Sequence, residues 1–237
     1  MKYLLIELVL LLVELALLLA TVILLLLSRR EWHGRAKLLD ALINATDVLT
    51  RQEYFNMAVE SLERARRSVY AVVTGTNPTT RSESFVREVL KAMAMAKTRG
   101  VLLNYLLPKS PERLRMGYEF VRAGADVKYH DGLVVYDLRF MAIDGKHAVI
   151  GLPEKVGENK PTKRGVFISS ETLVNMLMEY FNKFWHSAES YYDYLAEVVN
   201  KLLKENPDLS PQILARQLDV EVSEVEKLLK AGDQPSP

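Results

Sequence analysis

The sequence contains no cysteine among its 237 residues. Without thiols the chain forms no disulfide bonds, no thiolate metal site and no cysteine nucleophile, and this absence fits a reducing compartment. Nor does one sign of charge dominate, because 31 basic and 30 acidic residues leave a formal net charge of +1. Binding to nucleic acid or to an acidic surface would therefore depend on a local cluster of charge rather than on the field of the whole chain.

Histidine is also scarce, with four in the chain. His33, His147 and His186 have no acidic neighbours at the spacing of metal ligands, so the sequence gives no support for a metal site. We predict neither a metal nor a cofactor.

The first part of the chain is a long apolar run. Residues 3–27 are mostly leucine, and at 1.5 Å per residue a helix of this length spans about 37 Å, more than the ~30 Å core of a bilayer. A signal peptide has a shorter apolar core and a cleavage site of small residues, whereas this run leads directly into Ser28, Arg29 and Arg30. We predict that residues 1–28 are a transmembrane anchor, inserted in the lipid bilayer through residues 3–27.

Basic residues flank the anchor unequally. Arg29, Arg30, Arg35 and Lys37 follow it, and Lys2 alone precedes it. Because positive loops stay on the cytoplasmic side, we predict a single-pass membrane protein with its carboxy-terminal domain in the cytoplasm.

Three polar residues interrupt the apolar run at intervals of seven. Glu7, Glu14 and Thr21 therefore share one face of the helix. They would form a polar seam for helix association, with protonated carboxyl groups hydrogen-bonded between copies of the chain. In the alternative, Glu7 extends to the interface and Glu14 is only tolerated. The sequence leaves both interpretations open.

After a connector over 29–50, helical and strand-like patterns alternate. Amphipathic segments predict helices over 51–67 and 83–98, one opened by Pro111, and one from 170 or 171 to about 187. Short apolar or alternating segments predict strands over 68–74, 101–107, 126–129, 134–143, 147–152 and 165–169. The order predicts an α/β fold, a mixed β-sheet flanked by helices, as a domain over 51–190.

Five segments carry a family resemblance: YFNMAVESLERARRSVYAVV, VLKAMAMAKTRGVLLNYLL, FVRAGADVKYH, VYDLRFMAIDGKHAVIGL and MEYFNKFWHSAE. In this order they resemble the phospholipase D-like superfamily. That family carries H-x-K-x4-D on the strand before the Asp-Gly-Lys turn. The resemblance implies a histidine nucleophile that forms a phospho-histidine, supported by the lysine and the aspartate. It also implies a homodimer, since active single-copy relatives pair two half-sites.

The motif is degenerate here. Alignment on Asp144 places Arg139 at the lysine position and Asp137 at the histidine position. A carboxylate repels a phosphodiester and is a poor nucleophile toward it, whereas an arginine keeps the positive charge. The Gly-Ser-x-Asn of the family is replaced by Gly-Leu-Pro-Glu over 151–154. We therefore predict that the domain is not an enzyme.

The remaining motif residues define a candidate ligand-binding cleft of Asp137, Arg139, Asp144 and Arg164. We expect Arg139 and Asp144 to lie on one side of the strand–turn unit, where they would bind a small anionic or sugar-like ligand. The alternative, which we favour, is that they form a structural ion pair. His130, seven residues before Asp137, is favoured as a structural histidine over a displaced nucleophile.

The carboxy-terminal residues 191–231 read as three short helices, before a disordered tail over 232–237. Ser210 with Pro211 and then Ser223 are signals for the starts of the last two, an order that resembles a helix-turn-helix. The last helix begins with Glu224 and Glu226, where DNA-binding proteins place phosphate-binding residues. A protein-interaction module is therefore favoured over DNA binding.

Three functions follow from these observations. The favoured one is a catalytically inactive, membrane-tethered adaptor or sensor that binds a ligand or a protein partner on the cytoplasmic side. The alternatives are a membrane-anchored, DNA-binding transcription regulator and a phosphodiesterase or nuclease.

Overall fold

The computed structural model describes residues 46–74, 83–133, 139–152 and 164–232, which belong to one compact unit beginning at Thr46. The predicted anchor over 3–27, with Glu7, Glu14 and Thr21, lies outside the described residues, as do Asp137 and the tail after residue 232. Among the helices that are described, none is long and apolar enough to cross a membrane.

A mixed sheet of eight strands forms the centre of the unit, in the order β1-β7-β6-β5-β2-β3-β4-β8. The strands are β1 (Thr46–Thr50), β2 (Ser68–Val72), β3 (Leu102–Pro108), β4 (Asp126–His130), β5 (Arg139–Ile143), β6 (His147–Leu152), β7 (Arg164–Ile168) and β8 (Glu189–Ser190). Strands β2, β3 and β4 are parallel to one another, and every other neighbouring pair is antiparallel.

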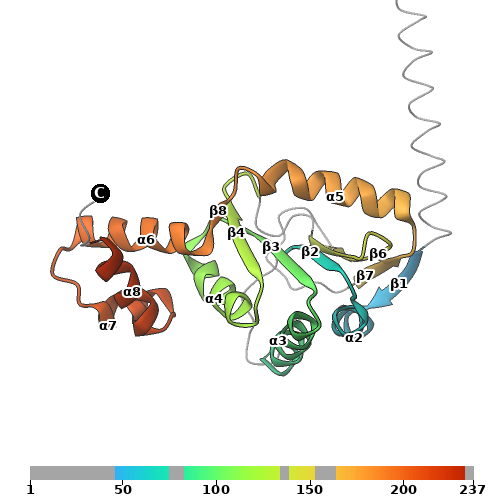
Figure 1. Cartoon of the computed structure of the whole chain (residues 1–237), viewed down its shortest axis with the longest axis horizontal. Coiled ribbons are helices and arrows are strands. Elements are labelled where there is room, and N and C mark those ends of the chain that lie inside the picture. Colours follow the sequence, from blue (N-terminus) through green and yellow to red (C-terminus); the bar gives the residue numbers. More distant parts are fainter. Residues whose placement is uncertain (1–45, 75–82, 134–138, 153–163, 233–237) are drawn as a thin grey trace, which may run out of the picture. The chain divides into compact units, whose positions relative to one another are not determined.

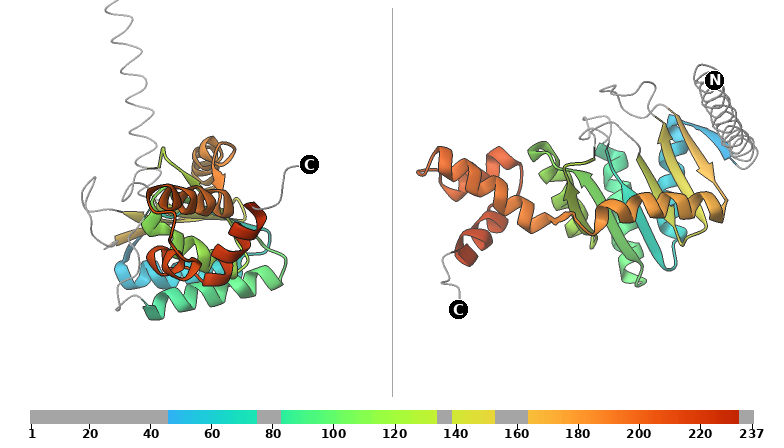
Figure 2. Two further views of the ribbon diagram at one scale, coloured as in Figure 1. Left: turned by 90° about the vertical axis from the view of Figure 1, so that its left-hand side faces the viewer. Right: turned by 90° about the horizontal axis from the view of Figure 1, so that it is seen from above.

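Helices cover both faces of the sheet (Figure 1). Helices α2 (Arg51–Arg64), α3 (Glu83–Thr98) and α4 (Leu114–Arg122) lie on one face, and a short 3-10 turn, η1 (Pro111–Arg113), precedes α4. Helix α5 (Glu171–Trp185) runs across the strands on the other face (Figure 2). The predicted fold class, a mixed α/β sheet flanked by helices, is confirmed.

Local sequence signals explain the start and burial of α2. Thr50 and Glu53 form a capping box, in which each side chain bonds the backbone amide of the other. Ala58 and Leu62 are buried beneath the sheet, at the helical spacing that predicted this face. In the strand that follows, Ala71 and Val72 point to opposite faces and both are buried, as in a central strand of a covered sheet.

The sheet begins earlier than the predicted domain boundary at residue 51. Thr46–Thr50, assigned to the connector, forms β1 and pairs antiparallel with β7, with Thr46 opposite Ile168. The partner residues lie 114 or more positions away in sequence, so the local pattern of the connector did not indicate the pairing. The predicted helix at Pro111 begins instead as the η1 turn, and α4 proper starts at Leu114.

The carboxy-terminal helices are α6 (Tyr191–Glu205), α7 (Pro211–Leu218) and α8 (Val222–Gly232). The Ser190 and Ser210 side chains cap α6 and α7, and α8 begins one residue before the predicted cap at Ser223. Leu214 and Val225 are fully buried in the same hydrophobic cluster as the residues of α4 and the sheet. The three helices thus share the core of the domain, whereas the sequence suggested a separate module.

Candidate functional site

The candidate site lies at one edge of the sheet. The parallel strands β2, β3 and β4 end there, and the antiparallel β5 begins there, so we call it the carboxyl edge. In open α/β sheets, ligands bind outside the carboxyl ends of parallel strands. The described polar residues at this edge include Thr74, Lys109, His130 and Arg139, from four neighbouring strands or the residues that follow them.

Arg139, the predicted anion-binding residue, is the first residue of β5 and is buried, with 6% of its surface exposed. It lies opposite Gly151 of β6, and a Cβ atom on that glycine would stand 2.7 Å from both Cγ and Cδ of Arg139. The hydroxyl group of Tyr54, from α2, would be 3.1 Å from the same position. Glycine at 151 therefore makes room for the arginine under α2.

The charge of Arg139 also reaches Tyr54. Burial raises the pKa of the Tyr54 phenol, and the neighbouring positive charge of Arg139 opposes part of that rise. An anion at the carboxyl edge would encounter the positive potential of this arginine in surroundings from which much of the water is excluded.

A second arginine is buried near the same edge. Arg113, in η1, is 3% exposed, and its guanidinium donates a hydrogen bond of 3.4 Å to the carbonyl of Thr74, just beyond β2. Its own carbonyl accepts a hydrogen bond of 3.0 Å from the hydroxyl of Tyr129. Arg113 and Arg139 thus give the carboxyl edge two buried cations, of which the sequence pattern indicated only Arg139.

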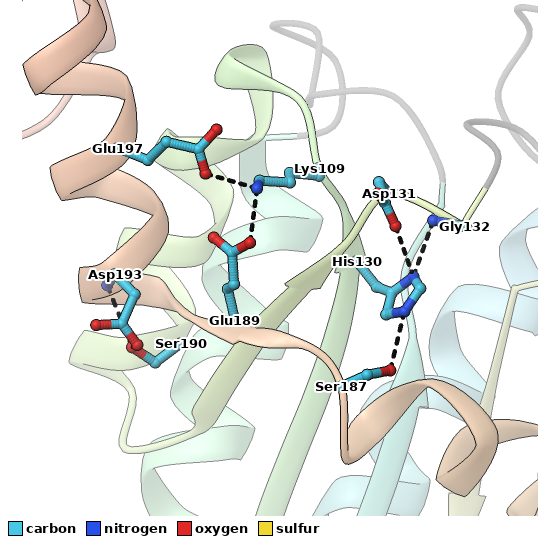
Figure 3. A network of polar contacts seen from close by, with 9 residues as sticks. All are labelled: Lys109, His130, Asp131, Gly132, Ser187, Glu189, Ser190, Asp193 and Glu197. Carbon is cyan, nitrogen blue, oxygen red and sulfur yellow. Dashed lines mark hydrogen bonds and ion pairs between the residues drawn. The ribbon is translucent and has the colours of Figure 1, made fainter.

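His130, at the end of β4, has both ring nitrogens in hydrogen bonds (Figure 3). The backbone amide of Gly132 donates to Nδ1 at 2.8 Å, and a carboxylate oxygen of Asp131 lies 3.3 Å from the same nitrogen. Nε2 is 3.1 Å from the Ser187 hydroxyl, which in turn donates to the carbonyl of Phe184. The imidazole therefore links β4 to the residues that follow α5.

Lys109 follows β3 and is engaged by two carboxylates (Figure 3). Its Nζ atom lies 2.7 Å from Glu189 in β8 and 2.5 Å from Glu197 in α6. The hydrogen bonds to Glu189 and Glu197 raise the pKa of Lys109, and the hydrogen bond from Lys109 lowers the pKa of Glu197. This group ties the carboxyl edge to the first of the carboxy-terminal helices.

Asp144, the aspartate of the degenerate motif, lies at the other end of β5. Its carboxylate accepts hydrogen bonds from three successive backbone amides: Arg66 at 3.0 Å, Arg67 at 2.8 Å and Ser68 at 3.0 Å. Burial raises the pKa of Asp144, but these three hydrogen bonds outweigh it, so the pKa is lowered overall. The side chain joins the turn after β5 to the turn before β2.

The expected ion pair between Arg139 and Asp144 is therefore wrong, as is the expectation that they share one side of the strand–turn unit. Five residues of strand separate them by about 16 Å at 3.3 Å per residue, beyond the reach of the two side chains. Asp144 belongs to the edge opposite the carboxyl edge, and it does not line the site around Arg139.

Arg164 does lie at the carboxyl edge, as the first residue of β7. Arg139, Gly151 and Gly165 are opposite one another on β5, β6 and β7, so they share one face of the sheet. Arg164 is next to Gly165 in β7, and it therefore belongs to the other face. Of the four predicted site residues, Arg139 and Arg164 thus share an edge but not a face, and Asp137 lies outside the described residues.

The turn between α7 and α8 is docked on α4. Arg122 of α4 pairs with Glu221 at 3.1 Å, and Arg115 lies 3.5 Å from Asp219, which occupies the left-handed conformation with φ of 52°. Glu224, in the first turn of α8, is 7% exposed and bonds Lys227 at 2.8 Å. The first turn of the helix that would read DNA is therefore engaged in packing against its own domain.

Sequence reasoning missed Lys109, Arg113 and Tyr54 because their partners are distant in the chain. The available signal was position: Lys109 directly follows a buried strand, at the edge where ligands of α/β sheets bind. Among the residues that the structure describes, no group of three or more His, Asp or Glu side chains could hold a metal ion.

No protein-family model matches the chain, and no curated protein matches it either. Several solved structures are similar to it. Nuc from Salmonella typhimurium, described as a phospholipase D family member, has 16% identity and a TM-score of 0.48, over 62% of this chain and 97% of Nuc. NucT from Helicobacter pylori has 12% identity and a TM-score of 0.48, over 61% and 98% of the two chains. TrmBL2, an archaeal chromatin protein, has 19% identity and a TM-score of 0.44, over 68% and 62%.

Proposed function

We propose that this chain is a catalytically inactive, membrane-tethered domain of the phospholipase D-like kind. In this proposal it acts as an adaptor or sensor, and its carboxyl edge binds an anionic ligand or a protein partner in the cytoplasm. The observation that carries the proposal is the state of His130, a histidine at the carboxyl edge whose two ring nitrogens both take part in hydrogen bonds.

Phosphodiester cleavage through a phospho-histidine needs an imidazole nitrogen with a free lone pair. In His130, Nδ1 accepts a hydrogen bond from the Gly132 amide and Nε2 is hydrogen-bonded to the Ser187 hydroxyl, so both nitrogens are engaged. The position that the family gives to its histidine is occupied by Asp137, whose charge would repel the substrate. Both points favour binding over catalysis.

The charge of the carboxyl edge supports an anionic ligand. Arg139 and Arg113 are both buried there, and Lys109 directly follows β3 at the same edge, although two carboxylates engage it. Guanidinium groups recognise carboxylates and phosphates through paired donors, and their charge does not titrate.

The first test is hydrolysis of bis(p-nitrophenyl) phosphate by the full chain in detergent. We expect no hydrolysis above the uncatalysed rate. The double substitution Asp137→His with Arg139→Lys restores the family motif and serves as the comparison. Hydrolysis by the unaltered chain that is lost in His130→Gln would overturn the proposal, because it would identify His130 as a nucleophile.

The second test is binding of inorganic phosphate, followed by the midpoint of thermal unfolding. We expect phosphate to raise the midpoint of the unaltered chain and of Arg139→Lys, which keeps the charge, but not of Arg139→Gln. Arg164→Gln, at the same edge on the other face, is the matched control and should respond as the unaltered chain does. An equal response of all four proteins would show that phosphate does not bind at Arg139.

The prediction of a membrane tether rests on the apolar residues 3–27 and on the basic residues that follow them. Because the chain has no cysteine, single cysteines introduced before and after this segment report the topology in intact cells. We expect Arg35→Cys to be protected from an impermeant maleimide and Lys2→Cys to react. The reverse pattern would place the domain outside the cytoplasm.

DNA binding is the second candidate, and the α7–turn–α8 arrangement favours it. The ion pair of Glu221 with Arg122 of α4 and the burial of Glu224 oppose it, because the start of α8 would have to leave its own domain before it could enter a major groove. The measurement is binding of the full chain to duplex DNA as a function of salt concentration. A steep, linear dependence of log K on log salt would support this candidate against the first.

A further inference from the structure

A group of exposed basic side chains lies at the edge of the sheet opposite the carboxyl edge. Arg64 is the last residue of α2, and Arg66 and Arg67 lie between α2 and β2. Lys146 lies in the turn between β5 and β6, and His147 is the first residue of β6. We call these five residues the basic edge. They line a pocket of about 560 Å³, together with Ser61, Ile143 and Phe167 among others.

The acidic residues of this pocket are already engaged. Glu60 pairs with Arg64 one helical turn away, and the Asp144 carboxylate is bound by three backbone amides. Arg66 and Arg67 hold Asp144 through their backbone, so their guanidinium groups remain exposed. Within the described part of the chain, neither these two side chains nor that of Lys146 takes part in an ion pair. The basic edge therefore has positive charge available for an external anion.

The chain enters the sheet at this same edge. Thr46, the first residue of β1, lies opposite Ile168 of β7, which lies opposite Ala148 of β6. Ala148 directly follows His147, and Ile143 at the end of β5 pairs with both His147 and Val69. The register thus places the start of β1 and the basic edge at one side of the domain.

Only 18 residues, 28–45, lie between the predicted membrane span, which ends at residue 27, and Thr46. Fully extended, such a connector reaches at most about 60 Å, so a membrane anchor would hold Thr46 within that distance of the bilayer. The connector itself carries Arg29, Arg30, Arg35 and Lys37. A cytoplasmic leaflet rich in anionic lipid attracts basic groups of this kind.

We propose that the basic edge binds the phosphate-bearing headgroups of anionic lipid in the membrane that carries the chain. This inference rests on the tether of the proposed function. It gives the domain an orientation in which the basic edge faces the bilayer and the carboxyl edge, at the far ends of the same strands, faces the cytoplasm. The ligand site would then be open to a soluble ligand or partner.

The experiment uses the full chain in nanodiscs, of phosphatidylcholine alone or with an equal part of phosphatidylserine. A fluorophore on Glu63→Cys, exposed at the end of α2, reports the basic edge, and one on Asp131→Cys reports the carboxyl edge. Headgroup-labelled nitroxide lipid quenches fluorophores that lie at the surface. We expect strong quenching at position 63 in anionic discs, weak quenching there in neutral discs, and weak quenching at position 131 in both.

The matched variants remove two positive charges each. The first pair, Arg66→Gln with Arg67→Gln, removes the charges at the basic edge but keeps the backbone amides that bind Asp144. The second pair, Arg87→Gln with Lys91→Gln, removes two charges from exposed residues of α3. Each arginine near an anionic leaflet contributes about fivefold to binding, so the first pair should lower the surface-bound population roughly 25-fold and the second pair should not.

Three results would overturn the proposal. The first is equal quenching at position 63 in neutral and anionic discs, and the second is an equal effect of the two variant pairs. The third is loss of binding to an acidic peptide in the Arg66 and Arg67 variant with quenching unchanged, which would make the basic edge a protein-binding surface. If the tether itself is wrong, the chain will instead fail to copurify with discs of either composition.

Discussion

The carboxylate of Asp144 accepts a hydrogen bond of 2.8 Å from the backbone amide of Arg67, which lies 77 residues earlier in the chain. The amides of Arg66 and Ser68 on either side donate to the same carboxylate at 3.0 Å. In return, the Asp144 amide donates to the carbonyl of Ser68 at 2.9 Å. The aspartate of the degenerate motif is therefore a structural clamp between two turns.

We expect Asp144→Asn to lower the free energy of unfolding by about 1.5–3 kcal/mol, because hydrogen bonds to a charged group contribute about that much to stability. Asparagine has the same size and tolerates the left-handed conformation, with φ of 53°, that Asp144 adopts. Urea unfolding measures the difference. Asp126→Asn, at the exposed start of β4, is the control and should change little; an equal loss in both variants would contradict the clamp.

The same clamp predicts a dependence of stability on pH. The folded-state pKa of Asp144 is lowered from its ordinary value of 3.8, so its contribution is complete above that value and is lost as the pH falls through the folded pKa. The difference in stability between the unaltered chain and Asp144→Asn should therefore shrink below pH 3.8. A difference that stays constant from neutral pH to acid would show that the charge of Asp144 does not matter.

Gly151→Ala should destabilise the domain by about 1–3 kcal/mol, the usual cost of forcing an extra carbon into a packed interior. The added Cβ would stand 2.7 Å from the side chain of Arg139. Thermal unfolding of Gly151→Ala, Arg139→Ala and the double variant measures the coupling. We expect the glycine substitution to cost less once the arginine is shortened, and strictly additive effects would argue against the close contact.

Lys109→Met should cost about 1 kcal/mol, since the lysine is partly buried but its carboxylate partners are largely exposed. The hydrogen bond from Lys109 lowers the pKa of Glu197 from 4.5, so this contribution is present above pH 4.5 and lost as the pH falls through the folded pKa. Urea unfolding at pH 7 and near pH 3 measures both effects. Lys183→Met on α5 is the control, and its effect should not depend on pH.

Glu14→Leu should weaken self-association of the full chain in detergent, if the polar seam of Glu7, Glu14 and Thr21 joins transmembrane helices. Sedimentation equilibrium measures the association constant. Leu12→Ala, away from the seam, is the control for general effects on the helix. Unchanged association in Glu14→Leu would favour the interpretation in which the glutamates are only tolerated.

The sequence by itself determined the local structure of the domain. Hydrophobic periodicity and end signals located α3 over Glu83–Thr98, α7 from Pro211 and β6 over His147–Leu152, and their alternation indicated a mixed α/β sheet. These features depend on residues within a few positions of one another. The opposite locations of Arg139 and Asp144 could also have been read from the sequence, because five residues of strand span about 16 Å.

Only the tertiary structure decided which distant residues meet. The pairing of β1 with β7, the Lys109 group with Glu189 and Glu197, and the three amides that bind Asp144 all join segments far apart in the chain. Such contacts depend on strand register and on side-chain packing across the whole sheet, for which one sequence carries no local signal. For the same reason the basic edge became apparent only when the register placed Thr46 beside the turns that carry Arg66 and Lys146.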